Sequence, residues 1–106
     1  MAAEPLDIHP AALAELKSAV LWYLERSETA AEKFVAQLYR AVELITSSPH
    51  RWPVGDHRTR KFVLTRFPYA VIYREKPTMI QILAIAHGHR RPDYWKERLE
   101  RSDESE

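Results

Sequence analysis

The chain has 106 residues, of which 45% are hydrophobic and 29% charged, with a formal net charge of +1. This composition indicates one ordinary globular domain and excludes a disordered chain. The absence of cysteine excludes disulfides, and without an apolar run of roughly 18 residues or a signal-peptide pattern we expect a cytoplasmic protein that does not contact a membrane.

The first half of the chain predicts a short strand and two helices. Leu6–His9 alternates apolar and polar residues, which favours a strand. In Ala11–Arg26, leucine and valine recur at helical spacing after a proline that suits the first helical position. Thr29–Glu32 (Thr-Ala-Ala-Glu) matches a capping box for a second helix, which must end near Pro49. The short link between the helices predicts an antiparallel hairpin.

The second half predicts three strands and a short helix. Lys61–Arg66, Tyr69–Arg74 and Met79–His87 are rich in residues that favour strands, and short links join them. Consecutive strands with short links pair antiparallel. The third run is almost continuously apolar, which predicts the most buried, central strand. We expect a final helix at Tyr94–Arg101.

Together these elements predict an α+β fold of order β-α-α-β-β-β-α, with a helical hairpin packed on a small, mainly antiparallel sheet. We expect residues 1–101 to form one domain and the acidic tail, residues 102–106, to be disordered. Charge is distributed unevenly: residues 1–48 contain 4 Lys/Arg against 7 Asp/Glu, whereas residues 49–101 contain 12 against 5. A basic second half indicates a polyanionic or acidic partner.

Two motifs in the second half, together with the element order, indicate a family. They are Phe67-Pro68-Tyr69-x-x-x-Tyr73 and Ala86-His87-x-x-Arg90-Arg91-Pro92-x-Tyr94-Trp95. The chain resembles the ParE/RelE superfamily, the toxins of bacterial type II toxin–antitoxin pairs, over nearly its whole length. The resemblance implies a RelE/ParE-like fold. It also implies one of two activities, since RelE-like members are ribosome-dependent ribonucleases that cut messenger RNA, whereas ParE-like members trap the cleaved-DNA intermediate of DNA gyrase.

Departures from the RelE-like pattern favour the ParE branch. RelE-like toxins supply Lys and Arg on the sheet, one Arg directly following a Tyr, and a Tyr near the C-terminus. Here Ala70 follows Tyr69, and Trp95 falls at the position of the C-terminal tyrosine. An indole cannot donate a phenolic proton to a leaving group. We therefore expect a plasmid-stabilisation toxin of the ParE type that inhibits gyrase without catalysis.

The basic C-terminal residues are the expected contact with the toxin's target: Arg90, Arg91, Trp95, Lys96 and Arg98. In the alternative interpretation, a RelE-like endoribonuclease acting on ribosome-bound messenger RNA, the catalytic candidates are His89, Arg90 and Arg91. A third interpretation is a degenerate toxin that acts only as a DNA-binding co-repressor with its antitoxin.

The resemblance also implies an antitoxin of the ParD type, a ribbon-helix-helix DNA-binding dimer whose flexible segment wraps the toxin in a hetero-oligomer. Leu21, Trp22 and Tyr39 are apolar residues in excess of what the inner helix faces require. Surplus exposed apolar area marks a partner surface. We therefore expect these three residues to contact the antitoxin.

Neither a metal nor another cofactor is expected. His87-x-His89 places two imidazoles on one face of a predicted strand. A metal site would need a third ligand, which only His50, His57 or an acid could supply from a loop, so structural histidines are the favoured interpretation. With only Gly55 and Gly88, the chain has no glycine-rich loop that would bind a nucleotide.

Overall fold

The computed structural model describes residues 5–99 and contains the first six predicted elements in the predicted order. They are β1 (Leu6–Ile8), α1 (Pro10–Arg26), α2 (Glu28–Ser47), β2 (Arg60–Val63), β3 (Tyr69–Glu75) and β4 (Ile80–His87). Two single-turn 3₁₀ helices, Pro49–Arg51 and Asp56–Arg58, lie between α2 and β2. The predicted acidic tail, residues 102–106, and the end of the predicted last helix lie outside the described residues.

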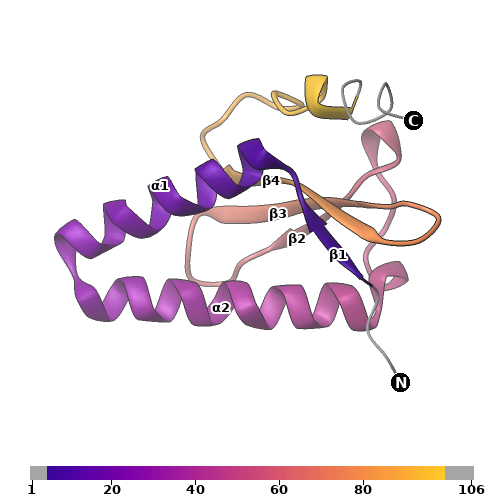
Figure 1. Ribbon diagram of the computed structural model, residues 1–106. Helices are drawn as coiled ribbons and strands as arrows, with labels where there is room; N and C mark the ends of the chain where they lie inside the picture. The colour runs from indigo at the N-terminus through magenta and orange to yellow at the C-terminus, as the bar shows by residue number, and fades with distance from the viewer. Residues whose placement is uncertain (1–4, 100–106) are drawn as a thin grey trace.

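The four strands form one mixed sheet in the order β1-β4-β3-β2. β2, β3 and β4 pair antiparallel, and β1 pairs parallel with β4. The prediction of a mainly antiparallel sheet with the last strand inside it is therefore confirmed. Figure 1 shows α1 and α2 side by side and antiparallel, with their connecting turn at the left of the view.

One residue, Ser27, separates the two helices. Its N–H donates to the Tyr23 carbonyl at 2.7 Å, which ends α1, and its Oγ accepts from the Ala30 N–H at 3.1 Å, which caps α2. The capping box predicted at Thr29–Glu32 is therefore wrong. The earlier serine takes the cap because α2 already begins at Glu28.

The sheet is buried on both faces. The main core lies between the sheet and the helical hairpin, and Phe34, Ile45 and Tyr73 are completely buried there. A smaller cluster on the opposite face joins Trp95 to β3 and β4. Burial from both sides explains why β4 is continuously apolar in sequence.

A register shift divides β4 into two halves. Ile72 of β3 pairs with Ala84 but Tyr73 pairs with Ile82, so Leu83 is the extra residue of a β-bulge. The neighbouring strand β1 ends at Ile8, opposite Ile82. From Leu83 onward, one edge of β4 therefore has no strand beside it.

Two predicted boundaries are corrected. β2 ends at Val63 rather than at Arg66, because the chain bends after Leu64 to enter β3. The last helix does not begin at Tyr94: residues 92–96 form turns, and helical conformation begins at residue 97 within the described residues. Asp93, with a φ of 59°, interrupts the backbone where the helix was expected to start.

Candidate functional site

The chain after β4, residues 88–99, is here called the C-terminal segment, and it covers the outer face of the sheet. Trp95 anchors it: the side chain is 6% exposed and packs with Ile72, Leu83 and Ala84. A buried tryptophan removes a large apolar area from water. The segment is therefore held against the sheet although most of its backbone is irregular.

A polar cluster ties the same segment to α1. Glu15 of α1 receives hydrogen bonds from both terminal nitrogens of Arg98, each at 2.9 Å, and from the Tyr94 hydroxyl at 2.6 Å. The Glu15 and Arg98 side chains are each only 16% exposed. Paired, two-pronged contacts of this kind fix geometry as well as contributing energy. Glu15, Tyr94 and Arg98 are called the clasp below.

The clasp also completes the open edge of β4. The Ile85 N–H donates to Glu15 Oε1 at 3.0 Å, and the Leu83 carbonyl accepts from Arg98 at 2.7 Å. These backbone groups lie where β1 has already ended and no strand can pair with them. A buried backbone group without a hydrogen-bond partner is costly. The clasp therefore supplies the hydrogen-bond partners that a longer β1 would otherwise have provided.

Around neutral pH the Glu15–Arg98 pair of the clasp is ionised, whereas Tyr94 keeps its proton. Burial on its own raises the pKa of Glu15, but hydrogen bonds from Arg98, Tyr94 and the Ile85 N–H outweigh burial and hold that pKa below its ordinary value. The hydrogen bond to Glu15 raises the pKa of Arg98. Burial and the same carboxylate raise the pKa of Tyr94 well above its ordinary value. The Tyr94 hydroxyl therefore keeps its proton and donates a hydrogen bond to Glu15.

A basic cleft of about 450 Å³ lies between the C-terminal segment and the sheet. Lys61, Arg90 and Arg91 line it and are exposed, and Lys96 is exposed nearby on the same segment. Ala70 and Ala86 contribute small side chains to its wall. Within residues 5–99, none of these four cations forms a salt bridge. We call this surface the basic cleft.

The loop before β2 forms the other wall of the basic cleft. His57 lies 3.8 Å from the Asp93 carboxylate, and its ring meets the Trp95 ring edge-on with 5.8 Å between centroids. His57, Arg58 and Asp93 all have positive φ angles, a conformation that side chains other than glycine adopt rarely. The loop and the C-terminal segment thus meet through strained backbone, which is a frequent feature of functional surfaces.

The residues predicted to contact the target divide into two groups. Arg90, Arg91 and Lys96 are exposed together on the C-terminal segment. The side chains of Trp95 and Arg98 instead point inward. Trp95 belongs to the outer-face cluster and Arg98 to the clasp. Glu15 carries no sequence signal of a functional residue, because its partner Arg98 is 83 residues away and no local motif links them.

The two candidate histidines do not share a strand face. His87 is the last residue of β4, and His89 lies in the following turn, with its N–H donating to His87 Nδ1 at 3.0 Å. Their rings are 5.1 Å apart. Across residues 5–99, no cluster of three or more His, Cys, Asp or Glu side chains is placed to hold a metal ion.

An apolar groove of about 660 Å³ runs along α1, α2 and β1. Leu21 and Tyr39 line it and are 60% and 71% exposed. The other predicted antitoxin contact, Trp22, is 50% exposed but lies on the opposite flank of α1, with the Arg26 guanidinium 3.7 Å above its ring. The groove is lined by Leu6, Ile8, Ala12, Leu13, Leu16, Lys17, Val20, Leu21, Val35, Leu38, Tyr39, Val42, Ile82 and Ile85.

Comparison with solved structures shows the same fold in a chromosomal ParDE toxin–antitoxin system from P. aeruginosa. The similarity has a TM-score of 0.69 at 24% sequence identity and covers 80% of this chain and 96% of the other. No curated protein matches the chain. Among the described residues, no helix combines the length and apolar character needed to cross a membrane.

Comparison with family models places the chain more narrowly. Residues 6–92 match the family described as the ParE toxin of the type II toxin–antitoxin system parDE. The matched region runs from β1 to the start of the C-terminal segment and includes the whole apolar groove and the cleft cations Lys61, Arg90 and Arg91. The chain therefore belongs to the ParE family of type II toxins.

Proposed function

We propose that this ParE-family protein acts in the cytoplasm by binding DNA gyrase and stabilising the cleaved-DNA complex of that enzyme. One observation carries the proposal: the exposed cations Arg90, Arg91 and Lys96 are displayed on a segment that Trp95 and the clasp hold in place. Exposed cations that form no salt bridge within residues 5–99, held on a fixed backbone, are suited to an anionic surface, whether acidic protein or DNA.

The arrangement supports binding more than it supports catalysis. A metal-free ribonuclease needs an acid for the leaving oxygen. Tyr94 is the tyrosine nearest the basic cleft, but its hydroxyl donates to Glu15. One observation favours the alternative endoribonuclease: His87, a potential general base, lines the cleft together with Arg90 and Arg91.

A gyrase cleavage assay tests the first function. Purified protein is incubated with gyrase, ATP and supercoiled plasmid, and the reaction is stopped with denaturant. Linear DNA should accumulate with the wild-type protein and should be abolished by Arg90→Ala combined with Arg91→Ala. Absence of linear DNA, together with normal gyrase turnover, would contradict the proposal. A ribosome-programmed messenger RNA cleavage assay would then test the endoribonuclease.

We further propose that a ParD-like antitoxin, a ribbon-helix-helix DNA-binding dimer, neutralises the protein by laying an amphipathic segment in the apolar groove. The groove is almost entirely hydrocarbon, with Lys17 as its charged lining residue among those described. Exposed apolar patches of this kind mark protein interfaces, and grooves between helices accept amphipathic helices. Family membership supports the antitoxin as the occupant.

Two leucines on α1 provide a matched test. Leu21 lines the groove, whereas Leu24 is similarly exposed, at 47%, and lies outside it. Leu21→Glu should weaken antitoxin binding at least about tenfold, since it places a charge in an apolar interface. Leu24→Glu should leave the affinity within about twofold. Equal losses of affinity for the two substitutions in isothermal titration calorimetry would show that the groove is not part of the antitoxin interface.

A further inference from the structure

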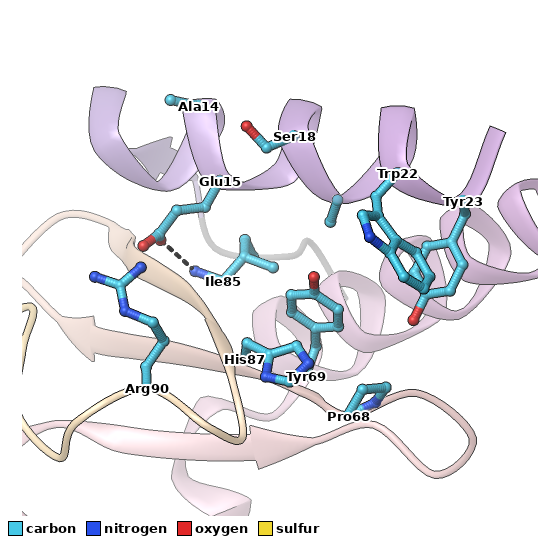
Figure 2. A pocket seen from close by; sticks show the side chains of 11 residues that line it. Ala14, Glu15, Ser18, Trp22, Tyr23, Pro68, Tyr69, Ile85, His87 and Arg90 are labelled. Carbon is cyan, nitrogen blue, oxygen red and sulfur yellow. Dashed lines mark hydrogen bonds between the residues drawn. The ribbon is translucent and has the colours of Figure 1, made fainter. Parts of the chain in front are cut away.

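A third pocket lies on the flank of α1 opposite the apolar groove. It has a volume of about 510 Å³ and opens between α1 and the adjoining ends of β3 and β4. Figure 2 shows its space between Glu15 and Arg90 on one side and Trp22 and Tyr23 on the other, above Tyr69 and His87. Because most of its polar groups are hydrogen-bond donors, it is called the donor pocket.

The neutral donors come from three aromatic side chains. Figure 2 shows the Tyr69 hydroxyl and the Trp22 indole nitrogen turned toward the space. Neither forms a hydrogen bond within the described residues 5–99. His87 Nδ1 accepts the His89 N–H, so a neutral His87 ring carries its proton on Nε2 and donates from there. Burial raises the pKa of Tyr69, so its hydroxyl keeps its proton at neutral pH.

Glu15, the acidic residue of the pocket, already has hydrogen-bond partners for both of its carboxylate oxygens. Each of its two oxygens accepts two hydrogen bonds, from the Ile85 N–H and Arg98 on one side and from Tyr94 and Arg98 on the other. Arg98 also neutralises its charge. The pocket therefore presents unused donors together with a carboxylate that has little capacity left to accept from a ligand.

Arg90 connects the donor pocket to the basic cleft, because it lines both. Its guanidinium stacks on the Tyr94 ring at 3.8 Å and forms no salt bridge within residues 5–99. Stacking leaves the guanidinium edge free for hydrogen bonds. A single anion in the donor pocket can therefore engage the same arginine that the toxic surface displays.

We propose that the donor pocket receives one Asp or Glu side chain of the antitoxin, whose carboxylate binds Arg90 with help from the aromatic donors around it. This inference rests on the proposed function, which supplies both the antitoxin and the role of Arg90. A carboxylate fits better than nucleic acid, because a strand of phosphates requires a run of cations. Such a run borders the basic cleft, whereas Trp22, Ser18 and Pro68 bring no charge to this pocket.

The proposed contact explains how one partner both binds and inactivates the protein. The apolar groove and the donor pocket lie on opposite flanks of α1, so a segment leaving the groove over α1 reaches the pocket directly. Once bound to a carboxylate, Arg90 is no longer available to the target. Neutralisation then follows from direct competition for one side chain and needs no change of fold.

Two adjacent arginines provide the test. Arg90 lines both the donor pocket and the basic cleft, whereas Arg91 lines the cleft and not the pocket. Affinity for the purified cognate antitoxin should fall at least about tenfold with Arg90→Gln and less than about threefold with Arg91→Gln. Tyr69→Phe, which removes one hydroxyl and keeps the ring, should weaken binding about threefold or more. Thermal unfolding of each variant checks that the fold is retained.

The acidic partner is then located by a double-mutant cycle. Each Asp or Glu of the antitoxin outside its DNA-binding domain is changed to Asn or Gln and titrated against wild-type protein and Arg90→Gln. One acid should couple to Arg90 by about tenfold. Equal weakening by Arg90→Gln and Arg91→Gln, or the absence of any coupled acid, would overturn the inference.

The same titrations separate failure of this inference from failure of the proposed function. If Leu21→Glu weakens binding while Arg90→Gln does not, the groove remains the antitoxin site and the donor pocket is not part of it. If neither substitution affects binding, the proposed antitoxin surface fails together with the inference.

Discussion

The helical hairpin and the C-terminal segment differ in how they are built and in what they display. The hairpin is regular, needs one serine to connect its helices, and exposes an apolar groove. The C-terminal segment has irregular backbone, depends on Trp95 and the clasp for its position, and exposes cations. A regular element can offer hydrocarbon to a partner without further support, whereas an irregular segment needs side chains elsewhere to hold it.

Helix α1 belongs to both regions. Leu21 on one flank lines the groove, and Glu15 on the other flank holds the C-terminal segment. The comparison therefore predicts that substitution of Leu21 damages antitoxin binding alone, whereas substitution of Glu15 damages the fold and the toxic surface.

The largest expected effect is loss of the clasp. Glu15→Ala leaves Arg98 largely buried without its carboxylate and leaves the Ile85 N–H unpaired, so the free energy of unfolding should fall by about 3 kcal/mol. Urea denaturation measures the change. Glu25→Ala on the same helix removes only an exposed contact at 3.7 Å and should cost less than about 0.5 kcal/mol. Similar costs for the two substitutions would show that the clasp does not hold the segment.

Reversing one charge on the C-terminal segment should have the next largest effect. Arg91→Glu should reduce the yield of linear DNA in the gyrase assay by at least about tenfold, because it places a repulsive charge in the proposed contact. Lys33→Glu makes the same change in net charge on α2, outside the basic cleft, and should leave the yield within about twofold. Loss of activity in both variants would point to overall charge rather than to this surface.

The turn of the hairpin should depend on one hydroxyl. Ser27→Ala removes the bond to the Ala30 N–H and should lower the free energy of unfolding by about 1 kcal/mol. Ser48→Ala at the other end of α2 removes a side chain that makes no capping bond to the following 3₁₀ helix and should cost less than about 0.5 kcal/mol. An unchanged midpoint for Ser27→Ala in urea would show that the Ser27 hydroxyl does not stabilise the start of α2.

The smallest expected effect is a dependence on acid pH. Because the folded protein holds the pKa of Glu15 below 4.5, this carboxylate stabilises the fold fully above that pH and loses its contribution as the pH falls below it. The stability advantage of wild-type protein over Glu15→Gln should therefore narrow between pH 5 and pH 3 or so. Urea midpoints measured across that range provide the check. An advantage that stays constant with pH would mean that Glu15 does not act as a charged group.

The sequence predicts the elements whose periodicity is uninterrupted. The two helices, the order of the strands and the burial of β4 follow from patterns of apolar residues. The bulge at Leu83 was hidden because Ile80–Ile85 is apolar at nearly every position, so an extra residue leaves no gap in the pattern. The capping-box spacing favoured Thr29, because Glu32 follows it by three residues, whereas Ser27 caps α2 without a glutamate at that spacing.

The candidate site was predicted in part. Basic composition and the motif after β4 identified Arg90, Arg91 and Lys96, which are exposed as expected. Composition alone cannot tell an exposed arginine from one in a salt bridge, so Arg98 was grouped with them although it belongs to the clasp. Glu15 and the donor pocket depend on contacts across the whole chain, which no local pattern records.

The most direct test of the account measures two properties of the same two variants: linear DNA in the gyrase assay, and affinity for the cognate antitoxin. Arg91→Glu should lose gyrase poisoning and retain antitoxin binding, whereas Tyr39→Glu, in the groove, should retain poisoning and lose binding. This crossed result would establish that the basic cleft and the apolar groove are separate functional surfaces. If either variant lost both properties, or if wild-type protein produced no linear DNA, the account would be contradicted.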